Sequence, residues 1–391
     1  MLSHVSADQD ITRSMNLQSL GNKLQRYRNQ LEASEEDVAK DTAISVDRLT
    51  QIEQGAVEPT GDEILILADF YRCDFKFFIS NEQVAPFEQT ETLYRAHGKE
   101  FSKADRAAIQ EFLYLCDTEQ FLTQELHGTS QEFSFAPTGT YFKGHAQDAA
   151  KALRKVMGHG ERQVPLDVYA EFRSVGVHVF RRKLSNSKIS GVFIQHPTAG
   201  KCILVNYTED VYRQRFSAAH EMAHAIFDSH EGASVTLQGD GADMREVRAN
   251  RFASCYLMPE EVICQLPDPS GWSESDTQLW ANKFRVSCDA LGIAVKEARL
   301  VDNDTSRRIR QYRVPREAKV DPELPERLTP EQRARKASLL TRGLSDHYVG
   351  LCLDAYSQDL ISLGRLSEAL LCGYAELAEI AKLYGRTLHG H

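Results

Sequence analysis

The stretch from Phe216 to Phe227 constrains this chain most. It contains His220-Glu221-x-x-His224, and its other residues are mainly Phe, Ala, Met and Ile, without Gly or Pro. This composition predicts a buried helix. His220 and His224 then lie one turn apart on the same face, where both imidazoles can bind one divalent metal ion. Glu221 projects about 100° further round the helix, beside a metal-bound water. The pattern predicts a zinc (Zn2+) site in which Glu221 is the general base of a hydrolase.

A third ligand is needed, and a second helical pattern offers one. Residues 244–253 follow a Gly-rich stretch and place Glu246 and Asn250 four residues apart, on one helix face. Glu246 can complete a His-His-Glu site that leaves the fourth position open for water, as catalytic zinc requires. Asn250 can accept a hydrogen bond from the outer N–H of a ligating histidine.

His230 is the rival third ligand. It follows His220 by ten residues, the spacing of H-E-x-x-H-x-x-G-x-x-H metal sites. Those sites have glycine where this chain has Phe227, although Asp228-Ser229 could also end the helix. The pattern therefore favours Glu246 and keeps His230 as an alternative.

The residues before the motif predict a small sheet. Three short runs have strand character, at residues 177–180, 189–194 and 202–206, with a hairpin turn between the second and third. An exposed edge of such a sheet could align an extended peptide by strand addition. Four side chains could stabilise the oxyanion of peptide hydrolysis, although a structural role is simpler for each: Tyr207, Tyr212, His230 and Tyr256.

Several pieces of sequence, in order, resemble the ImmA/IrrE family of metallopeptidases. They are Ile189-Ser190-Gly191, Ile203-Leu204-Val205-Asn206, Phe216-Ser217-Ala218-Ala219-His220-Glu221-Met222-Ala223-His224, Glu246-x-x-Ala249-Asn250-x-Phe252-Ala253 and Leu257-Met258-Pro259. The resemblance covers about residues 140–300. It implies a gluzincin-like zinc site with Glu246 as third ligand. It also implies endopeptidase action on a repressor-type partner protein in a stress, phage or DNA-damage-linked response.

The N-terminal part contains sequence signals for four short helices. These signals are an apolar stripe from Leu17 to Leu31, a capping box at Ser34 and Asp37, a helix cap at Ser45 with Gly55 at the far end, and Pro59-Thr60 before a fourth helix. This order, together with Ile52-Glu53-Gln54-Gly55-x-x-x-Pro59, resembles the lambda-repressor-like (XRE) helix-turn-helix DNA-binding domain. On the third helix, Ser45, Arg48 and Gln51 are the candidate contacts with DNA or with a partner protein.

The charge of this module argues against strong DNA binding. Between Leu17 and Ala85 there are seven basic and thirteen acidic residues, whereas neutralisation of phosphates supplies most non-specific DNA affinity. A homodimer could still bring Arg48 and Gln51 together on a groove. The alternative is an acidic interaction module that docks a partner regulator or the rest of the chain.

The C-terminal third predicts a basic linker followed by helices. From Arg307 to Arg342 there are eleven basic and five acidic residues, punctuated by prolines, which predicts an extended linker. Such a linker could contact nucleic acid or the acidic N-terminal module. Amphipathic patterns from Leu339 onward predict two or three packed helices.

The predicted fold is multidomain and mainly α, with a small β-sheet. Its parts are an all-α helix-turn-helix domain at 17–85, a helical connector at 86–140, an α+β gluzincin-like metallopeptidase domain at 141–302, a basic Pro-containing linker at 303–338 and a helical C-terminal region at 339–391. The eight cysteines are scattered without a C-x-x-C motif, and neither a membrane span nor a signal segment is apparent. A cytoplasmic protein is therefore expected.

The favoured function is a regulatory zinc endopeptidase with a protein substrate. One alternative is a non-proteolytic helix-turn-helix transcriptional regulator whose zinc domain is structural or sensing. Another is an interaction protein whose acidic helical module binds a basic partner or another copy of itself. The intact Glu221 favours the enzyme, because a purely structural metal site needs no general base.

Overall fold

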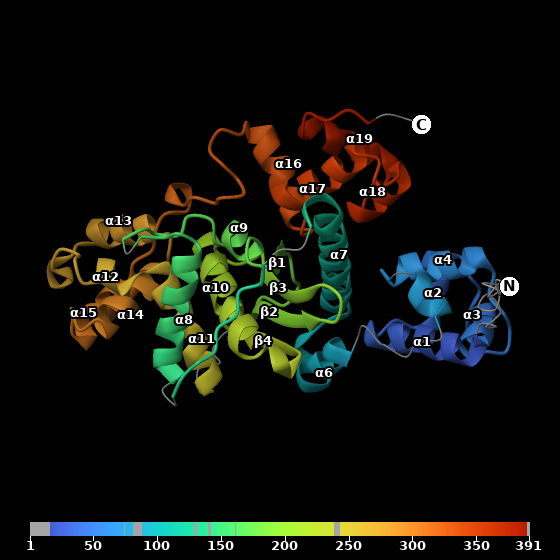
Figure 1. Ribbon diagram of the computed structural model, residues 1–391, viewed down its shortest axis with the longest axis horizontal. Coiled ribbons are helices and arrows are strands. Elements are labelled where there is room, and N and C mark those ends of the chain that lie inside the picture. Colours follow the sequence, from blue (N-terminus) through green and yellow to red (C-terminus); the bar gives the residue numbers. More distant parts are fainter. Residues whose placement is uncertain are drawn as a thin grey trace, which may run out of the picture. The chain divides into compact units, whose positions relative to one another are not determined.

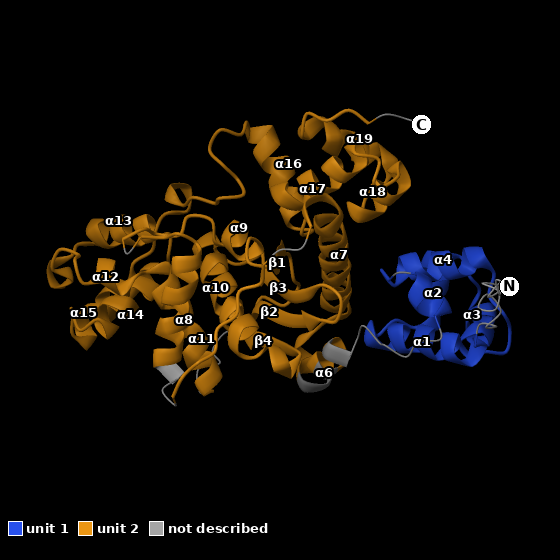
Figure 2. Cartoon of the chain, in the orientation of Figure 1, with its two compact units in different colours: residues 1–85 blue, residues 86–391 orange. Residues whose placement is uncertain are grey.

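The computed structural model describes residues 16–73, 75–80, 88–128, 131–139, 142–160, 162–237 and 243–388. The chain forms two compact units, residues 1–85 and 86–391 (Figure 2). Helices dominate, and one small sheet lies in the second unit (Figure 1). The predicted fold class is therefore confirmed. In the part of the chain that the structure describes, no helix has both the length and the apolar composition needed to cross a lipid bilayer.

The first unit is helical throughout its described part. Its helices are α1 Leu17–Gln30, α2 Glu35–Thr42, α3 Val46–Glu53, α4 Gly61–Phe70 and α5 Phe75–Ile79. The first four are the predicted ones, and two predicted caps are present. Ser34 and Asp37 form a capping box, and the Ser45 hydroxyl accepts a hydrogen bond from the Arg48 N–H. These side chains satisfy backbone donors that the first turn of a helix leaves unpaired.

The Ile52-Glu53-Gln54-Gly55 motif joins α3 to α1. Ile52 is fully buried, and the Glu53 carboxylate accepts hydrogen bonds from the Arg28 guanidinium at 2.8 and 2.7 Å. The two helices approach closely at Gly21, where a Cβ atom would lie 2.3 Å from the Glu53 carbonyl oxygen. Gly55 has a φ of +66°, which glycine adopts without steric cost. The motif therefore holds α3 against α1.

The second unit is built on a sheet with the strand order β1-β3-β2-β4. The strands are β1 Val177–Arg182, β2 Ile189–His196, β3 Gly200–Asn206 and β4 Ala233–Leu237. β1 is parallel to β3, whereas β2 is antiparallel to both β3 and β4. The three predicted strands and the hairpin from β2 to β3 are confirmed. β4 was not predicted, although Ala233, Val235 and Leu237 alternate with Ser234 and Thr236 along its five residues. It covers the edge of β2 that could otherwise receive an extended peptide.

Alternate residues of the strands enter two hydrophobic cores, one on each face of the sheet. One core contains Val179 and Phe193, and the other contains Phe180 and Ile194. The first core is completed by α8 Phe142–Val156, α9 Val168–Arg173, α10 Val211–Phe227, α11 Met244–Leu257, α12 Glu260–Ile263, α13 Glu274–Phe284, α14 Cys288–Glu297 and α15 Asn303–Gln311. The second is completed by α6 Glu88–His97, α7 Lys103–His127, α16 Pro330–Leu340, α17 Asp346–Ser357, α18 Leu363–Ala369 and α19 Tyr374–Leu383. Single-turn 3-10 helices are η1 Gly98–Glu100, η2 Ser229–Glu231, η3 Pro269–Gly271 and η4 Arg316–Ala318.

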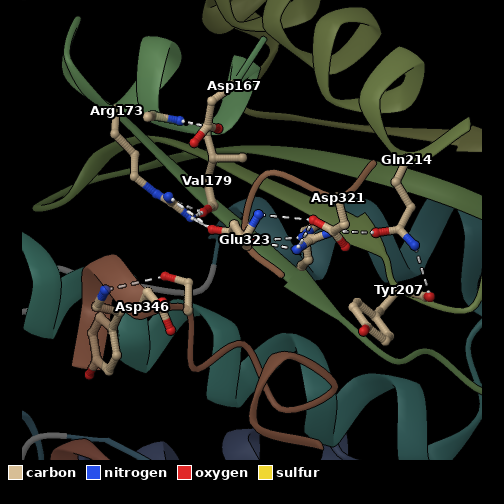
Figure 3. Close-up of polar contacts among 12 residues, drawn as sticks. Asp167, Arg173, Val179, Tyr207, Gln214, Asp321, Glu323 and Asp346 are labelled. Atoms are coloured by element: carbon tan, nitrogen blue, oxygen red, sulfur yellow. Dashed lines mark hydrogen bonds and ion pairs between the residues drawn. The ribbon is translucent and has the colours of Figure 1, made fainter. Parts of the chain in front are cut away.

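The C-terminal third differs from the predicted extended linker. Residues 303–338 contain α15, η4 and most of α16, and the helices that follow share a core with β2 and α7. Between η4 and α16, Asp321 and Glu323 form ion pairs with the buried Arg181 of β1. Glu323 also pairs with Arg173 of α9 (Figure 3). The arginines and prolines of this segment suggested solvent exposure, but Asp321 and Glu323 pair with arginines that lie well over a hundred residues earlier, and Glu323 is buried.

Candidate metal centre

The His-Glu-x-x-His stretch lies on α10, as predicted. The Asp210 carboxylate caps this helix by accepting a hydrogen bond from the Tyr212 N–H. The helix packs between the β2–β3 hairpin and α11, which buries most of its surface. His220 and His224 are 3% and 2% exposed, and Glu221 is fully buried. Burial on this scale requires every polar group to find a partner or a bound ion.

A hydrogen-bond chain anchors the start of α10. Gln214 donates hydrogen bonds to the carbonyl oxygens of Tyr207 and Glu209, at 3.0 and 2.7 Å, and accepts one from Arg181 at 3.1 Å. Figure 3 shows Gln214 to the right of Asp321 and above Tyr207. The helix that carries the two histidines is thus tied both to the end of β3 and to the C-terminal segment.

Glu246 lies in the first turn of α11, directly against both imidazoles. One carboxylate oxygen is 3.1 Å from His220 Nε2, and the other is 3.2 Å from His224 Nε2. The ligand atoms of the three residues all lie within 4.8 Å of one another. In the described part of the chain, no other group of three such side chains comes this close. The structure therefore brings together the three predicted ligands.

The outer nitrogens of both imidazoles are hydrogen-bonded to side-chain oxygens. His220 Nδ1 faces Asn250 Oδ1 at 3.0 Å, and His224 Nδ1 faces Asp228 Oδ2 at 2.9 Å. Both oxygens can accept a proton held on Nδ1, so the two Nε2 lone pairs converge 3.2 Å apart. This is the tautomer that a metal-binding histidine needs.

Asp228 is a site residue that the sequence analysis used only as a helix end. It stands four residues after His224, on the same helical face, and that spacing is the signal that could have found it. Arg248 of α11 pairs with the other Asp228 oxygen and stacks on Phe227, 4.4 Å from the ring centre. Asp228 is therefore held from two sides while it orients the His224 ring.

The pKa values of the cluster reflect its crowded charges. Burial alone would lower the pKa of His224, but hydrogen bonds with Asp228 and Glu246 raise it to about 10. Burial would raise the pKa of Glu246, but the two histidines lower it to about 2. Burial raises the pKa of Glu221 against the opposing effect of both imidazoles. These shifts arise because a carboxylate faces both imidazoles at close range, an arrangement that suits a divalent cation.

The chemistry of the donor set fits such a cation. Two imidazole nitrogens and one carboxylate form a three-ligand set typical of catalytic zinc. Neither oxygen of Glu221 has a hydrogen-bond partner among the described residues, and this carboxylate lies against the backbone of Gly191, where a Cβ atom would be 2.6 Å from Glu221 Oε1. A buried carboxylate without a donor costs free energy, so its retention beside the ligands favours a chemical role.

The remaining sequence candidates lie elsewhere. His230 is exposed in η2 and is not part of the cluster. The Tyr212 hydroxyl donates to Asn282, and the Tyr256 hydroxyl donates to Glu171 at 2.6 Å. The Tyr207 ring faces the Arg181 guanidinium at 5.4 Å. These contacts give each tyrosine a structural role and leave the oxyanion-stabilising group unassigned.

The helix-turn-helix candidates lie together on α3. Gln51 is exposed and Ser45 caps the helix. The Arg48 guanidinium donates two hydrogen bonds of 2.8 Å to the Glu63 carboxylate and one of 3.0 Å to the Glu58 carbonyl. This pairing lowers the pKa of Glu63 to about 2. Arg48 is thus engaged within its own unit.

Comparison with known families agrees with both units. Residues 172–296 match a peptidase family described as the IrrE N-terminal-like domain, and residues 19–74 match a helix-turn-helix domain. The first match spans β1 to α14 and so includes the whole histidine and glutamate cluster. A search of curated proteins finds no match to this chain. The chain therefore combines an N-terminal helix-turn-helix domain with an IrrE N-terminal-like peptidase domain.

Proposed function

We propose that this protein is a regulatory, zinc-dependent endopeptidase. The observation that carries the proposal is the convergence of His220, His224 and Glu246 on one point, beside the buried and unpartnered Glu221. A metal site that only stabilised the fold would have no use for this fourth residue, whereas hydrolysis needs a base next to the metal. The match to a peptidase family supports the same reading.

The roles of the residues follow from their contacts. Zinc, held by the two Nε2 atoms and the Glu246 carboxylate, would supply Lewis-acid polarisation of a peptide carbonyl and acidification of water. Asn250 and Asp228 keep the imidazole protons on Nδ1, which leaves the inner nitrogens as lone-pair donors. Glu221 accepts the proton of the attacking water and delivers it to the leaving peptide nitrogen.

The substrate class in the proposal is a partner regulatory protein, of the repressor type. The resemblance to the ImmA/IrrE family implies such a substrate, together with a stress, phage or DNA-damage-linked signal. The fusion to a helix-turn-helix domain supports it, because this module can bring the peptidase to a regulator or to the DNA that the regulator occupies. Binding of the partner would then raise its effective concentration at the site.

Metal content tests the ligand set. We expect purified protein to hold about one zinc per chain. Zinc should be lost in Glu246→Ala, which removes the residue that bridges both histidines, and kept in His230→Ala, which alters an exposed residue outside the cluster. Elemental analysis after dialysis against a weak chelator measures both. Zinc lost in His230→Ala alone would contradict the ligand set, and a wild type that takes up no zinc would contradict the function.

We also propose that the helix-turn-helix domain binds DNA through α3, with Gln51 exposed and Arg48 restrained by Glu63. The Glu63→Gln variant should release Arg48 for a phosphate. We expect several-fold tighter binding to duplex DNA. The slope of the logarithm of the binding constant against the logarithm of salt concentration should become steeper by about one. Fluorescence anisotropy at several salt concentrations measures this.

Glu36→Gln is the matched control for this experiment. Glu36 is an exposed acid on α2, so its replacement changes the net charge equally but leaves Arg48 paired. Equal effects of the two variants would show that net charge alone governs binding. If neither variant nor the wild type bound DNA, the module would be a protein-interaction domain instead.

A further inference from the structure

Glu221 is the one member of the site without an orienting contact. Its side chain is fully buried, and both its oxygens lack a hydrogen-bond partner among the described residues. The carboxylate lies against Gly191 of β2, where a Cβ atom would be 2.6 Å from Oε1 and 2.8 Å from Cγ. Position 191 therefore gives room to this carboxylate but offers it no side-chain donor. A base in this state can rotate, whereas proton transfer needs fixed geometry.

A rigid frame surrounds this contact. Ser190 of β2 donates a hydrogen bond to Glu209 Oε1 at 2.8 Å, and Ser217 of α10 donates to Glu209 Oε2 at 3.1 Å. One carboxylate thus bridges the strand beside Gly191 to the helix one turn before Glu221. The backbone on both sides of Glu221 is fixed, so only its own carboxylate lacks a restraint.

β4 places a hydroxyl beside that carboxylate. Thr236 is the direct partner of Gly191 in the antiparallel pairing of β2 with β4. Residues directly opposite each other point to the same face, with Cβ atoms about 4.5–5.5 Å apart. On β2 the next residue of this face is Phe193, which enters the core shared with α10. The Thr236 side chain therefore points to the face of the sheet that α10 covers.

In the part of the chain that the structure describes, the Thr236 hydroxyl lacks a hydrogen-bond acceptor, just as the Glu221 carboxylate lacks a donor. It is buried and has no hydrogen-bond partner among the described residues. It lies close to Glu221, since Thr236 pairs with Gly191 and the Glu221 carboxylate packs against that glycine. A buried donor without an acceptor and a buried acceptor without a donor each destabilise the folded protein. A hydrogen bond between the two groups removes both of these free-energy penalties.

We infer that the Thr236 hydroxyl donates a hydrogen bond to the Glu221 carboxylate and holds it in the orientation needed for proton transfer. Thr236 is thus a positioning residue for the reaction proposed above, and this role depends on that function. The strand that the sequence did not predict thereby contributes to the site without touching the metal ligands.

A double-mutant cycle in the metal-free, full-length protein tests the contact. Thr236→Val keeps the shape of the side chain and removes the hydroxyl, and Glu221→Met keeps the length of the other side chain and removes the acceptor. We expect Thr236→Val to lower the unfolding temperature in the wild-type background and to have little effect in the Glu221→Met background. Thr236→Ser should behave as the wild type. An equal loss in both backgrounds would overturn the proposal.

Ser234→Ala is the matched control for the cycle. Ser234 belongs to the same strand and its hydroxyl is also buried and unpartnered, but it lies opposite Phe193 rather than Gly191. We expect its effect to be the same with and without Glu221. Coupling of Ser234 to Glu221 as strong as that of Thr236 would show a general effect of β4 and would contradict the specific contact.

Kinetics of the zinc-loaded protein test the positioning role. On a peptide selected from a proteome-derived library, Thr236→Val should lower kcat about 10- to 100-fold with little change in KM or zinc content, and Thr236→Ser should restore most of the rate. An unchanged kcat in Thr236→Val, together with a large loss in Glu221→Gln, would overturn the role. No loss in Glu221→Gln would instead overturn the proposed function, and the metal-free cycle would still report on the contact.

Discussion

We expect the Glu221→Gln variant to bind zinc like the wild type and to lose about 100- to 10,000-fold of its rate of peptide hydrolysis. The amide has nearly the shape of the carboxylate, so the contact with Gly191 is preserved, but it cannot accept the proton of the attacking water. The zinc ligands His220, His224 and Glu246 are unchanged. Zinc analysis and cleavage of the partner protein, or of library peptides, measure the two properties separately.

The stability of this variant gives a second readout. Glu221 is fully buried, and the amide oxygen of the variant can still accept a hydrogen bond from Thr236, so removing the buried charge should leave the metal-free protein at least as stable as the wild type. Glu260→Gln, at an exposed acidic position on α12, is the control and should change neither rate nor stability. A Glu221→Gln variant that kept its full rate would exclude Glu221 as the base. Full cellular activity in that variant would support a non-proteolytic regulator.

The second large effect is expected from Glu323→Gln, which should lower the free energy of unfolding of the second unit by about 3–5 kcal/mol. The Arg181 side chain is fully buried and depends on Asp321 and Glu323 for its counter-charge, and Arg173 shares Glu323 (Figure 3). Removing one carboxylate leaves two buried guanidinium groups short of a partner. Glu326→Gln is the control, because Glu326 is exposed in the same segment.

The tryptophans make this measurement specific. The chain has two, Trp272 and Trp280, and both lie in the second unit, stacked 6.3 Å apart. Denaturant unfolding followed by their fluorescence therefore reports on that unit without interference from the helix-turn-helix unit. Equal stability of Glu323→Gln and Glu326→Gln would contradict a supporting role for the C-terminal segment.

The Glu323 carboxylate should also make the free energy of unfolding depend on pH. Burial would raise the pKa of Glu323, but Arg181 and Arg173 lower it overall. The stability from this carboxylate is present above its unfolded-state pKa, about 4.3, and is lost as the pH falls through the lower folded-state value. The difference in unfolding free energy between wild type and Glu323→Gln should therefore shrink in acid. A difference that stayed constant or grew on acidification would show that charge is not its source.

Local patterns in the sequence were enough to predict the helix-turn-helix unit and the helix of the metal centre. Ser34, Ser45 and Gly55 act within one turn of their own helices, so the sequence around each one contains the whole interaction. The same holds for His220 and His224, because helical periodicity alone puts them on one face. The spacing of Asp228 from His224 is also a local pattern of this kind, because the two residues lie one helical turn apart.

Contacts between distant segments could not be read in this way. Whether Glu246 or His230 joins the two histidines depends on how α11 packs against α10. The role proposed for Thr236 depends on the pairing of β4 with β2, and the five residues of β4 do not contain the identity of the strand that they pair with.

The segment from 303 to 338 shows the difference most clearly. Its composition is basic and rich in proline, which is typical of exposed linkers, yet Glu323 is 7% exposed and bound to arginines of β1 and α9. By itself, the sequence determined the helices, their caps and the His-Glu-x-x-His face, because backbone hydrogen bonds and periodicity act over a few residues. Only the tertiary structure decided the third member of the cluster, the pairing of β4 with β2 and the burial of Glu323, because ion pairs and packing act through space between residues that the chain keeps far apart.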